Sequence, residues 1–227
     1  GVGKISRQSV KNMLVEHDID PGRQRGKGSW SEFLQIHAET LWQVDFFSKR
    51  IWTMQRPRQT FSMVFLHAAS RRVFVTPATL RPDEAWMKSQ ASAFLAHVES
   101  EQLRCSIVMR DLDGKYSSDF DRLFTDRKIQ VQPVGPRAPN LNAFVERWIQ
   151  SLKHEALNHV VVFGLEHFDY IVNEYVAYYL ERRPHQGIGN RLIGAVEMDE
   201  PTPVVSIDEV KCEARLGGLL KHYYRAA

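Results

Sequence analysis

The chain has 227 residues, of which 43% are hydrophobic and 25% charged, and its formal net charge is +3 at pH 7. This length and composition suit a soluble globular protein with one main domain and short extensions, and no apolar run reaches the ~18 residues of a membrane span. The two cysteines, Cys105 and Cys212, lie far apart and exclude a disulfide framework.

Residues 1–20 contain a predicted helix that begins after Ser6 and ends near Glu16. Arg7 and Lys11 near its start resemble side chains of the second half of a helix-turn-helix motif, where they enter the major groove of DNA. A plain packing helix is the alternative. Residues 21–29, P-G-R-Q-R-G-K-G-S, are rich in Gly, Pro and basic residues and predict a basic linker.

Residues 30–190 form the predicted core. Apolar, β-branched runs predict five strands, at residues 41–48, 59–68, 71–76, 105–110 and 128–133. Amphipathic or capped runs predict five helices, at residues 31–37, 82–100, 118–126, 139–155 and 166–181. Hairpin strands followed by crossover units predict an α/β fold, with a mixed five-stranded sheet and helices on both faces.

Residues 191–227 are a C-terminal extension that ends in E-A-R-L-G-G-L-L-K-H-Y-Y-R-A-A. Its mixture of apolar, basic and tyrosine residues predicts a tail that packs on the core or on a neighbouring subunit. Contact with DNA is the alternative, because aromatic and basic side chains together suit nucleic acids.

Two acidic residues stand in strand-like apolar surroundings. Asp45 lies in L-W-Q-V-D-F-F-S, and Asp111 ends the run S-I-V-M-R-D. A carboxylate at such a position is costly unless it is paired or binds a metal. With Glu146 on the helix at 139–155, three carboxylates without a histidine or cysteine cluster suit Mg²⁺ or Mn²⁺. Phosphodiester cleavage with two metal ions uses this chemistry.

The helix at 139–155 has two unlike faces at about 100° per residue. One face is an apolar stripe of Leu141, Phe144, Val145, Trp148 and Leu152. The opposite face carries Asn142, Glu146, Ile149, Gln150 and Lys153. We expect Asn142, Gln150 and Lys153 to contact DNA phosphates near Glu146, together with Arg147 in the basic run 127–153. A merely solvated polar face is the alternative.

These segments resemble, in order, the Asp, Asp, Glu signature of the integrase-core superfamily, which includes retroviral integrases and bacterial insertion-sequence transposases. They read W-Q-V-D-F-F, R-D-L-D-G-K-Y and P-N-L-N-A-F-V-E-R-W. Asp111 and Glu146 are 146 − 111 = 35 positions apart, which resembles the family spacing. The tract R-P-H-Q-G that begins at Arg183 resembles one that follows the core in bacterial members. The resemblance covers about residues 30–190.

The resemblance implies a ribonuclease-H-like fold in which the strands of Asp45 and Asp111 are parallel neighbours that face the helix of Glu146. It implies that these three acids are catalytic and hold two Mg²⁺ (or Mn²⁺) ions per active site. The implied activity is cleavage of the DNA ends of a mobile element and strand transfer into target DNA. His185 in R-P-H-Q-G would orient the site or the DNA, with a structural role as the alternative.

The implied partners are double-stranded DNA, as element ends and target, and further copies of the chain in a homo-oligomer on DNA. No membrane is involved, and the expected location is the bacterial cytoplasm, in association with the nucleoid. Two other functions stay open: a nuclease of the same fold that cuts without joining, and a non-catalytic, DNA-binding remnant of a transposase. Asp113 competes with Asp111 as the second acid, although the spacing and Tyr116 favour Asp111.

Overall fold

The structure is a computed structural model that describes residues 13, 16, 30–135, 139–186, 190–193 and 206–225. The chain divides into two compact units, Gly1–Ile36 and His37–Ala227. Helix α2 (Trp30–His37) confirms the helix predicted at 31–37. Arg7, Lys11, most of the predicted N-terminal helix and the linker at 21–29 lie outside the described residues.

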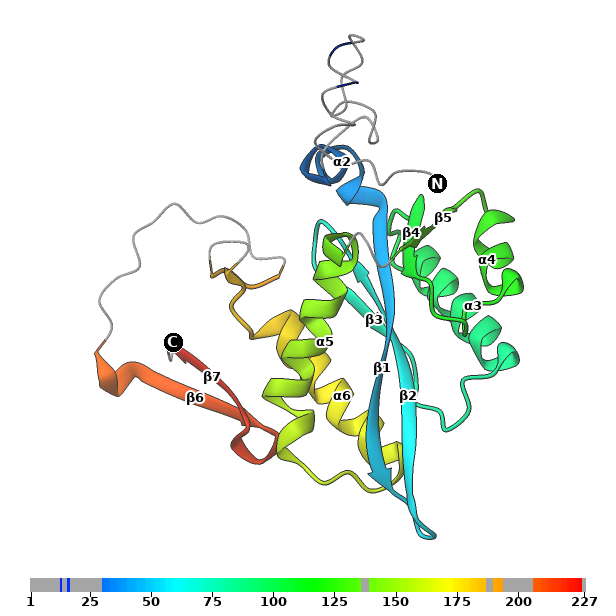
Figure 1. Ribbon diagram of the computed structural model, residues 1–227. Helices are drawn as coiled ribbons and strands as arrows, with labels where there is room; N and C mark the ends of the chain where they lie inside the picture. Colours follow the sequence, from blue (N-terminus) through cyan, green and yellow to red (C-terminus); the bar gives the residue numbers. More distant parts are fainter. Residues whose placement is uncertain are drawn as a thin grey trace. The chain divides into compact units, whose positions relative to one another are not determined.

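A mixed five-stranded sheet forms the centre of the second unit (Figure 1). Its strands, in chain order, are β1 (Leu41–Trp52), β2 (Pro57–His67), β3 (Val73–Val75), β4 (Ile107–Asp111) and β5 (Gln130–Val134). The spatial order is β3-β2-β1-β4-β5, in which β2 is antiparallel to β1 and β3, and β4 is parallel to β1 and β5. The predicted sheet is confirmed, and the strands of Asp45 and Asp111 are parallel neighbours.

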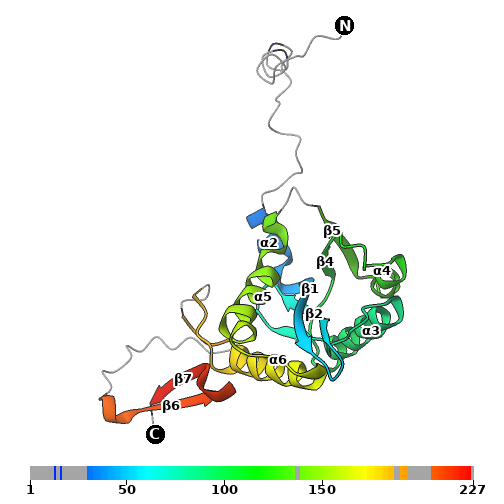
Figure 2. The same cartoon turned by 60° about the horizontal axis from the view of Figure 1, so that its bottom comes forward.

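Helices cover both faces of this sheet (Figures 1 and 2). Helices α3 (Glu84–Ser100) and α4 (Ser118–Thr125) bury one apolar core, with Phe65 and Phe94 stacked at 4.0 Å between ring centroids. Helices α5 (Ala143–Glu155) and α6 (Gly164–Glu181) bury a second core on the other face. Burial of apolar surface on both sides of the sheet stabilises the fold and leaves β1 and β4 in its centre.

The ends of the helices follow local rules. The Asp83 side chain accepts a hydrogen bond from the backbone N–H of Trp86 at 2.9 Å and caps α3. The helix predicted at 139–155 consists of a 3-10 turn, Pro139–Asn142, followed by α5. The chain therefore tightens just before the helix that carries Glu146.

The predicted polar face of this helix is wrong at two positions. Ile149 is 6% exposed and Asn142 is 3% exposed. The reason is that α5 packs against both β1 and α6, since Trp148 contacts Phe47 and Tyr175 with ring centroids 5.9 Å apart in each case. A helix held between two elements buries a wider arc than one stripe.

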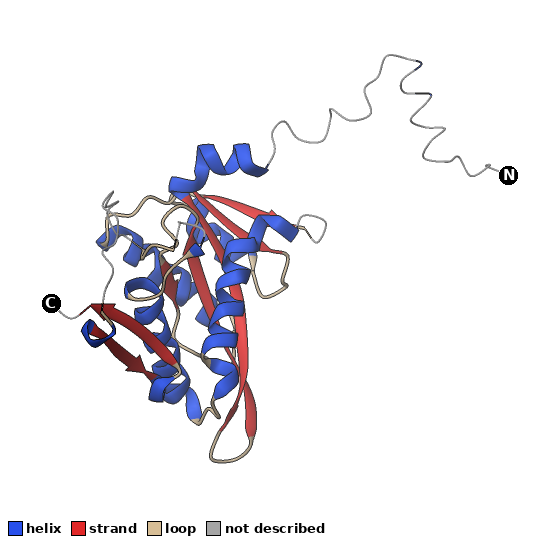
Figure 3. Cartoon of the chain, turned by 90° about the vertical axis from the view of Figure 1, so that its left-hand side faces the viewer, coloured by secondary structure: helices blue, strands red, loops and turns tan. Residues whose placement is uncertain are grey.

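The C-terminal extension contains an antiparallel hairpin of β6 (Val210–Arg215) and β7 (Leu220–Arg225) (Figure 3). Its connection uses Gly217 and Gly218 at φ 68° and 95°, where a Cβ would be strained. Leu220 is buried in the α5–α6 core, and Arg215 pairs with Glu174 at 3.6 Å. The hairpin was not predicted, but its packing on the core agrees with the expected tail.

No helix in the described parts of the chain is long and apolar enough to span a membrane.

Candidate active site

Two of the predicted acids lie level with each other on adjacent strands. β1 and β4 pair in parallel with Val44 opposite Arg110, so the next residues along are Asp45 and Asp111. Side chains alternate between the faces of a strand, so Asp45 shares the face of Gln43 and Phe47, which both contact α5. The strand register therefore directs Asp45 toward the helix that carries Glu146.

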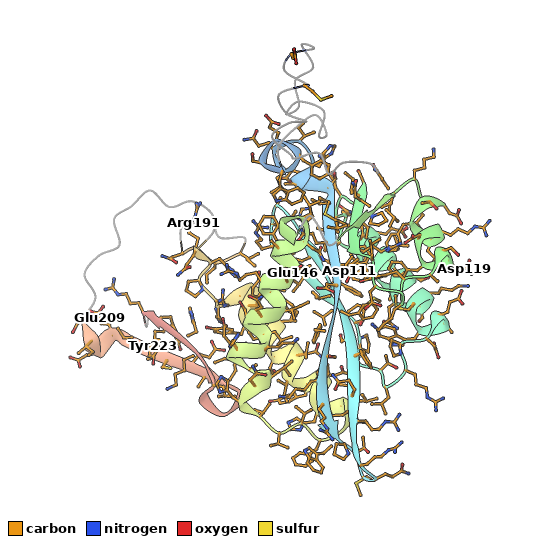
Figure 4. The ribbon with its side chains drawn as sticks, in the orientation of Figure 1. Asp111, Asp119, Glu146, Arg191, Glu209 and Tyr223 are labelled. Atoms are coloured by element: carbon orange, nitrogen blue, oxygen red, sulfur yellow. The ribbon has the colours of Figure 1, made fainter. Side chains whose placement is uncertain are left out.

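Other acids act on the charge of Asp45. The pKa of Asp45 is raised to about 7, first because the carboxyl is buried and then because Asp111, Glu146 and Asp113 repel its charge. A hydrogen bond of 2.7 Å from the N–H of Phe46 to Asp45 Oδ1 opposes this effect only in part. Figure 4 labels Asp111 and Glu146, and the charges of both raise the pKa of the Asp45 carboxylate.

Gln43 fastens the start of α5 to β1. Its side chain is fully buried, and its Oε1 accepts hydrogen bonds from the backbone N–H groups of Phe144 and Val145, both at 3.1 Å. Its Nε2 donates to the carbonyl of Leu141 at 2.6 Å. The first N–H groups of a helix have no partner within the helix, so this side chain supplies an acceptor for two of them. Gln43 thereby positions the helix that carries Glu146 against the strand that carries Asp45.

Sequence reasoning missed Gln43. The available signal was an amide inside an apolar strand, two residues before Asp45 and therefore on the same face. Buried polar side chains need partners, so an unexplained Gln at this position indicates a fixed contact.

Asn142 makes the second such contact. Its Nδ2 donates to the carbonyl of Val44 at 3.4 Å, and its Oδ1 is buried without a partner in the described residues. Asn142 is therefore not the exposed polar residue of the alternative reading, and its contact with DNA stays a prediction. Its amide instead links the turn before α5 to the residue that precedes Asp45.

Asp111 and Asp113 are the two candidates for the second acid of the site, and they differ in their hydrogen-bond partners. Asp113 accepts hydrogen bonds from Lys115 Nζ at 2.6 Å and from the Lys115 backbone N–H at 2.9 Å. Burial raises the pKa of Asp113, but these bonds and the Lys115 charge outweigh it and lower the pKa. Asp111 raises the pKa of Asp45 more than Asp113 does. These contacts favour Asp111 as the second acid and give Asp113 a partner of its own.

Arg110 links the end of β4 to α4 through hydrogen bonds. Its guanidinium donates to both carboxylate oxygens of Asp121, at 2.9 and 2.7 Å, and to the backbone carbonyl of Asp111 at 2.8 Å. Tyr116 lies 5.1 Å from this guanidinium, and its buried hydroxyl has no hydrogen-bond partner in the described residues. Burial and the charges of Asp45 and Asp111 raise the pKa of Tyr116, so this hydroxyl stays neutral beside the acids.

The site has the donor chemistry of a divalent-cation site. In the part of the chain that the structure describes, no group of three or more His, Cys, Asp or Glu side chains is arranged to hold a metal. One oxygen each of Asp45 and Asp111 accepts a nearby backbone N–H instead. The raised pKa of Asp45, whose charge Asp111 and Glu146 repel, nevertheless fits a hard cation, which would relieve the repulsion.

The remaining predicted site residues lie on or near α5. Glu146, Arg147 and Gln150 are exposed, and Lys153 is half-buried. His185 is 7% exposed, and its Nε2–H donates to the carbonyl of Tyr179 at 3.0 Å, which is the structural alternative considered for it. Contacts of these side chains with DNA stay predictions.

Comparisons with known proteins agree with the motifs. Residues 127–192 match a family model described as integrase core domain, and no curated protein matches the chain. A chain of the simian T-cell lymphotropic virus intasome, solved in complex with PP2A regulatory subunit B56 gamma, has a similar fold, with a TM-score of 0.52 at 16% identity. The match covers 74% of this chain and 59% of that chain, so this chain spans less than two thirds of it.

Two integrase cores give further matches. The HTLV-2 integrase catalytic core domain in complex with magnesium has a TM-score of 0.49 at 16% identity, over 67% of this chain and 92% of that chain. The catalytic core domain of BIV integrase has a TM-score of 0.47 at 15% identity, over 66% and 88%.

The sheet order, its helices and the integrase-core match together define a ribonuclease-H-like core. Over residues 127–192 the chain is similar to the integrase core domain, and its fold is similar to that of a retroviral integrase chain.

Proposed function

We propose that this protein is a polynucleotidyl transferase of the transposase and integrase type, which cleaves the DNA ends of a mobile element and joins them to target DNA. The observation that supports this proposal is that burial, together with the charges of Asp111 and Glu146, raises the pKa of Asp45 to about 7, on a strand that pairs in parallel with the strand of Asp111. Acids that destabilise one another are kept together where a divalent cation or a substrate needs them.

The proposed ligands are two Mg²⁺ or Mn²⁺ ions. Asp45, Asp111 and Glu146 would hold them. When bound, such ions activate the attacking oxygen and stabilise the leaving oxygen of the phosphodiester. The pKa of Asp45 would then fall, because the nearby positive charge favours the carboxylate.

The protein's own residues supply position. Gln43 and Asn142 hold the start of α5 on β1 and so set the place of Glu146 relative to Asp45. Gln150 and Lys153 on α5 would bind phosphates near the cleaved bond, and Arg147 on the same helix would bind a phosphate elsewhere along the DNA. Water attack would nick the end of the element, and attack by the freed 3′-hydroxyl in the same site would join it to target DNA.

The decisive experiment is joining of DNA strands. Purified protein is incubated with a labelled end oligonucleotide and supercoiled plasmid, with Mg²⁺ or with EDTA. We expect Mg²⁺-dependent transfer of label to the plasmid, and we expect Asp45→Asn to abolish it while DNA binding in a mobility shift is retained. Transfer by the Asp45→Asn variant at the wild-type rate would contradict the proposed site.

The same experiment separates the alternatives. Nicking of plasmid without transfer of label supports a nuclease of this fold. A mobility shift with no nicking in Mg²⁺ or Mn²⁺ supports a DNA-binding remnant of a transposase. Because two DNA ends must be held together, we propose that the protein acts as a homo-oligomer on DNA. The proposed location is the bacterial cytoplasm, at the nucleoid.

A further inference from the structure

A cavity of about 740 Å³ lies on the side of α5 away from the candidate active site. Its walls come from the turn between β2 and β3, from α5, from the last turns of α6 and from the R-P-H-Q segment. Residues that matter for its chemistry are Arg71, Phe144, Arg147, Trp148, Tyr178 and Arg183. Its volume falls in the range of about 300–1,000 Å³ that is typical of small-molecule sites.

Arg71 is held in this wall at a conformational cost. Its backbone has φ 61°, in the left-handed region that an arginine rarely adopts. Its guanidinium stacks on the ring of Phe144, 3.4 Å from the ring centroid. Its Nη1 is buried and has no hydrogen-bond partner in the described residues. Strain and an unused charged donor at one residue indicate a ligand rather than a contribution to folding.

The cavity has a second unused donor. Trp148 is 1% exposed, and its Nε1–H is buried without an acceptor in the described residues. By contrast, Arg183 donates to both oxygens of Glu155, at 2.7 to 3.2 Å, so that its charge is compensated. Arg71 and Arg147 have no ion pair among the described residues, so the lining has an excess of positive charge and of donors. An acceptor-rich anion fits this surface.

Helix α5 contributes residues both to the cavity and to the candidate active site. Ala143 and Arg147 line the cavity and lie three residues before and one residue after Glu146 on α5. A helix with its side chains is about 10–12 Å across, so the cavity and Glu146 are separated by about one helix diameter. DNA bound over the exposed side of α5 would span both, because a duplex is wider than this helix.

We propose that this cavity takes one unstacked nucleotide of the DNA substrate, an inference that rests on the proposed function. Arg71 and Arg147 would bind its phosphates, and the base would lie against the Tyr178 ring and the guanidinium plane of Arg71. Stacking on aromatic and guanidinium planes is independent of base identity. Enzymes that act on DNA commonly extrude a nucleotide into a pocket, which separates the strands near the reacting bond.

The test compares two short duplexes that differ by one unpaired, bulged nucleotide. Binding is measured by fluorescence anisotropy in EDTA, so that no cleavage is needed. We expect wild-type protein to bind the bulged duplex roughly tenfold more tightly, the effect of one stacked base. Arg71→Asn should abolish this preference, because Asn tolerates a positive φ but provides no guanidinium. Its melting temperature should match that of wild type.

Arg72→Asn is the matched control, since Arg72 is the exposed neighbour in the same turn and is absent from the cavity wall. It should retain the preference for the bulged duplex. Equal binding of both duplexes by wild type, or an unchanged preference in Arg71→Asn, would overturn the inference. The inference would also be overturned if an oligoglutamate peptide bound in an Arg71-dependent way while the bulge had no effect on DNA binding. The cavity would then bind a protein carboxylate. If the wild-type protein shows no metal-dependent joining but still prefers the bulged duplex, the proposed function is contradicted and the inference about the cavity is not.

Discussion

Asp45→Asn should stabilise the protein in the absence of metal while it destroys activity. The pKa of the Asp45 carboxyl rises from 3.8 to about 7 on folding. At about 1.36 kcal/mol per pKa unit, the ionised side chain costs the folded state about 4 kcal/mol above pH 7. Asparagine carries no charge, so we expect a gain of about 2–4 kcal/mol in the free energy of unfolding, or roughly 5–15 °C in melting temperature.

The pH dependence of unfolding should show the same destabilising effect of the ionised Asp45 side chain. Between pH 4 and 7 the folded protein retains a proton on Asp45 that the unfolded chain has lost. The contribution of Asp45 to wild-type stability is therefore fully present below about pH 4 and is lost as the pH rises to about 7. The Asp45→Asn variant should lack this loss, so the difference between the two proteins should grow from pH 4 to pH 8.

Thermal unfolding followed by circular dichroism, in EDTA and in Mg²⁺, measures both effects. Mg²⁺ at 100 times its dissociation constant should stabilise wild type by about 2.7 kcal/mol and should stabilise Asp45→Asn much less. Asp119→Asn is the control, because Asp119 is an acid on α4 that pairs with Lys88 at 3.1 Å outside the site. This variant should show no gain. A lower melting temperature for Asp45→Asn than for wild type in EDTA at pH 8 would refute the reasoning.

Three further predictions concern the supports of the site. Gln43→Leu removes three hydrogen bonds at the start of α5 and should cost about 2–3 kcal/mol in urea unfolding and reduce Mg²⁺-dependent joining; full joining activity would show that the contact does not position Glu146. Asp111→Asn should abolish joining, whereas Asp113→Asn should retain most of it, because Asp113 is paired with Lys115; the reverse result would make Asp113 the second acid. A double-mutant cycle of Arg183→Gln and Glu155→Gln should give a coupling of about 1 kcal/mol in urea unfolding, and additive effects would contradict a stabilising pair.

The sequence by itself determined the elements and the three acids. Alternating apolar runs and capping residues predicted the five strands and their helices, because these signals act over a few residues. The element order predicted a mixed sheet with helices on both faces, since a hairpin followed by crossover connections leaves few topologies, and the resemblance implied that the first and fourth strands are parallel neighbours. Asp45 and Asp111 were informative because an acid in an apolar run needs a partner, and the position of Glu146 followed from the resemblance.

Only the tertiary structure decided how these residues are held. Gln43 and the N–H groups of α5 are about a hundred positions apart, and nothing local in either segment specifies their contact. The burial of Asn142 and Ile149 depends on what packs against α5, and the cavity at Arg71 forms from segments that are far apart in the sequence. Hydrogen bonds, burial and raised pKa values arise between distant segments, so they exist only once the chain has brought those segments together.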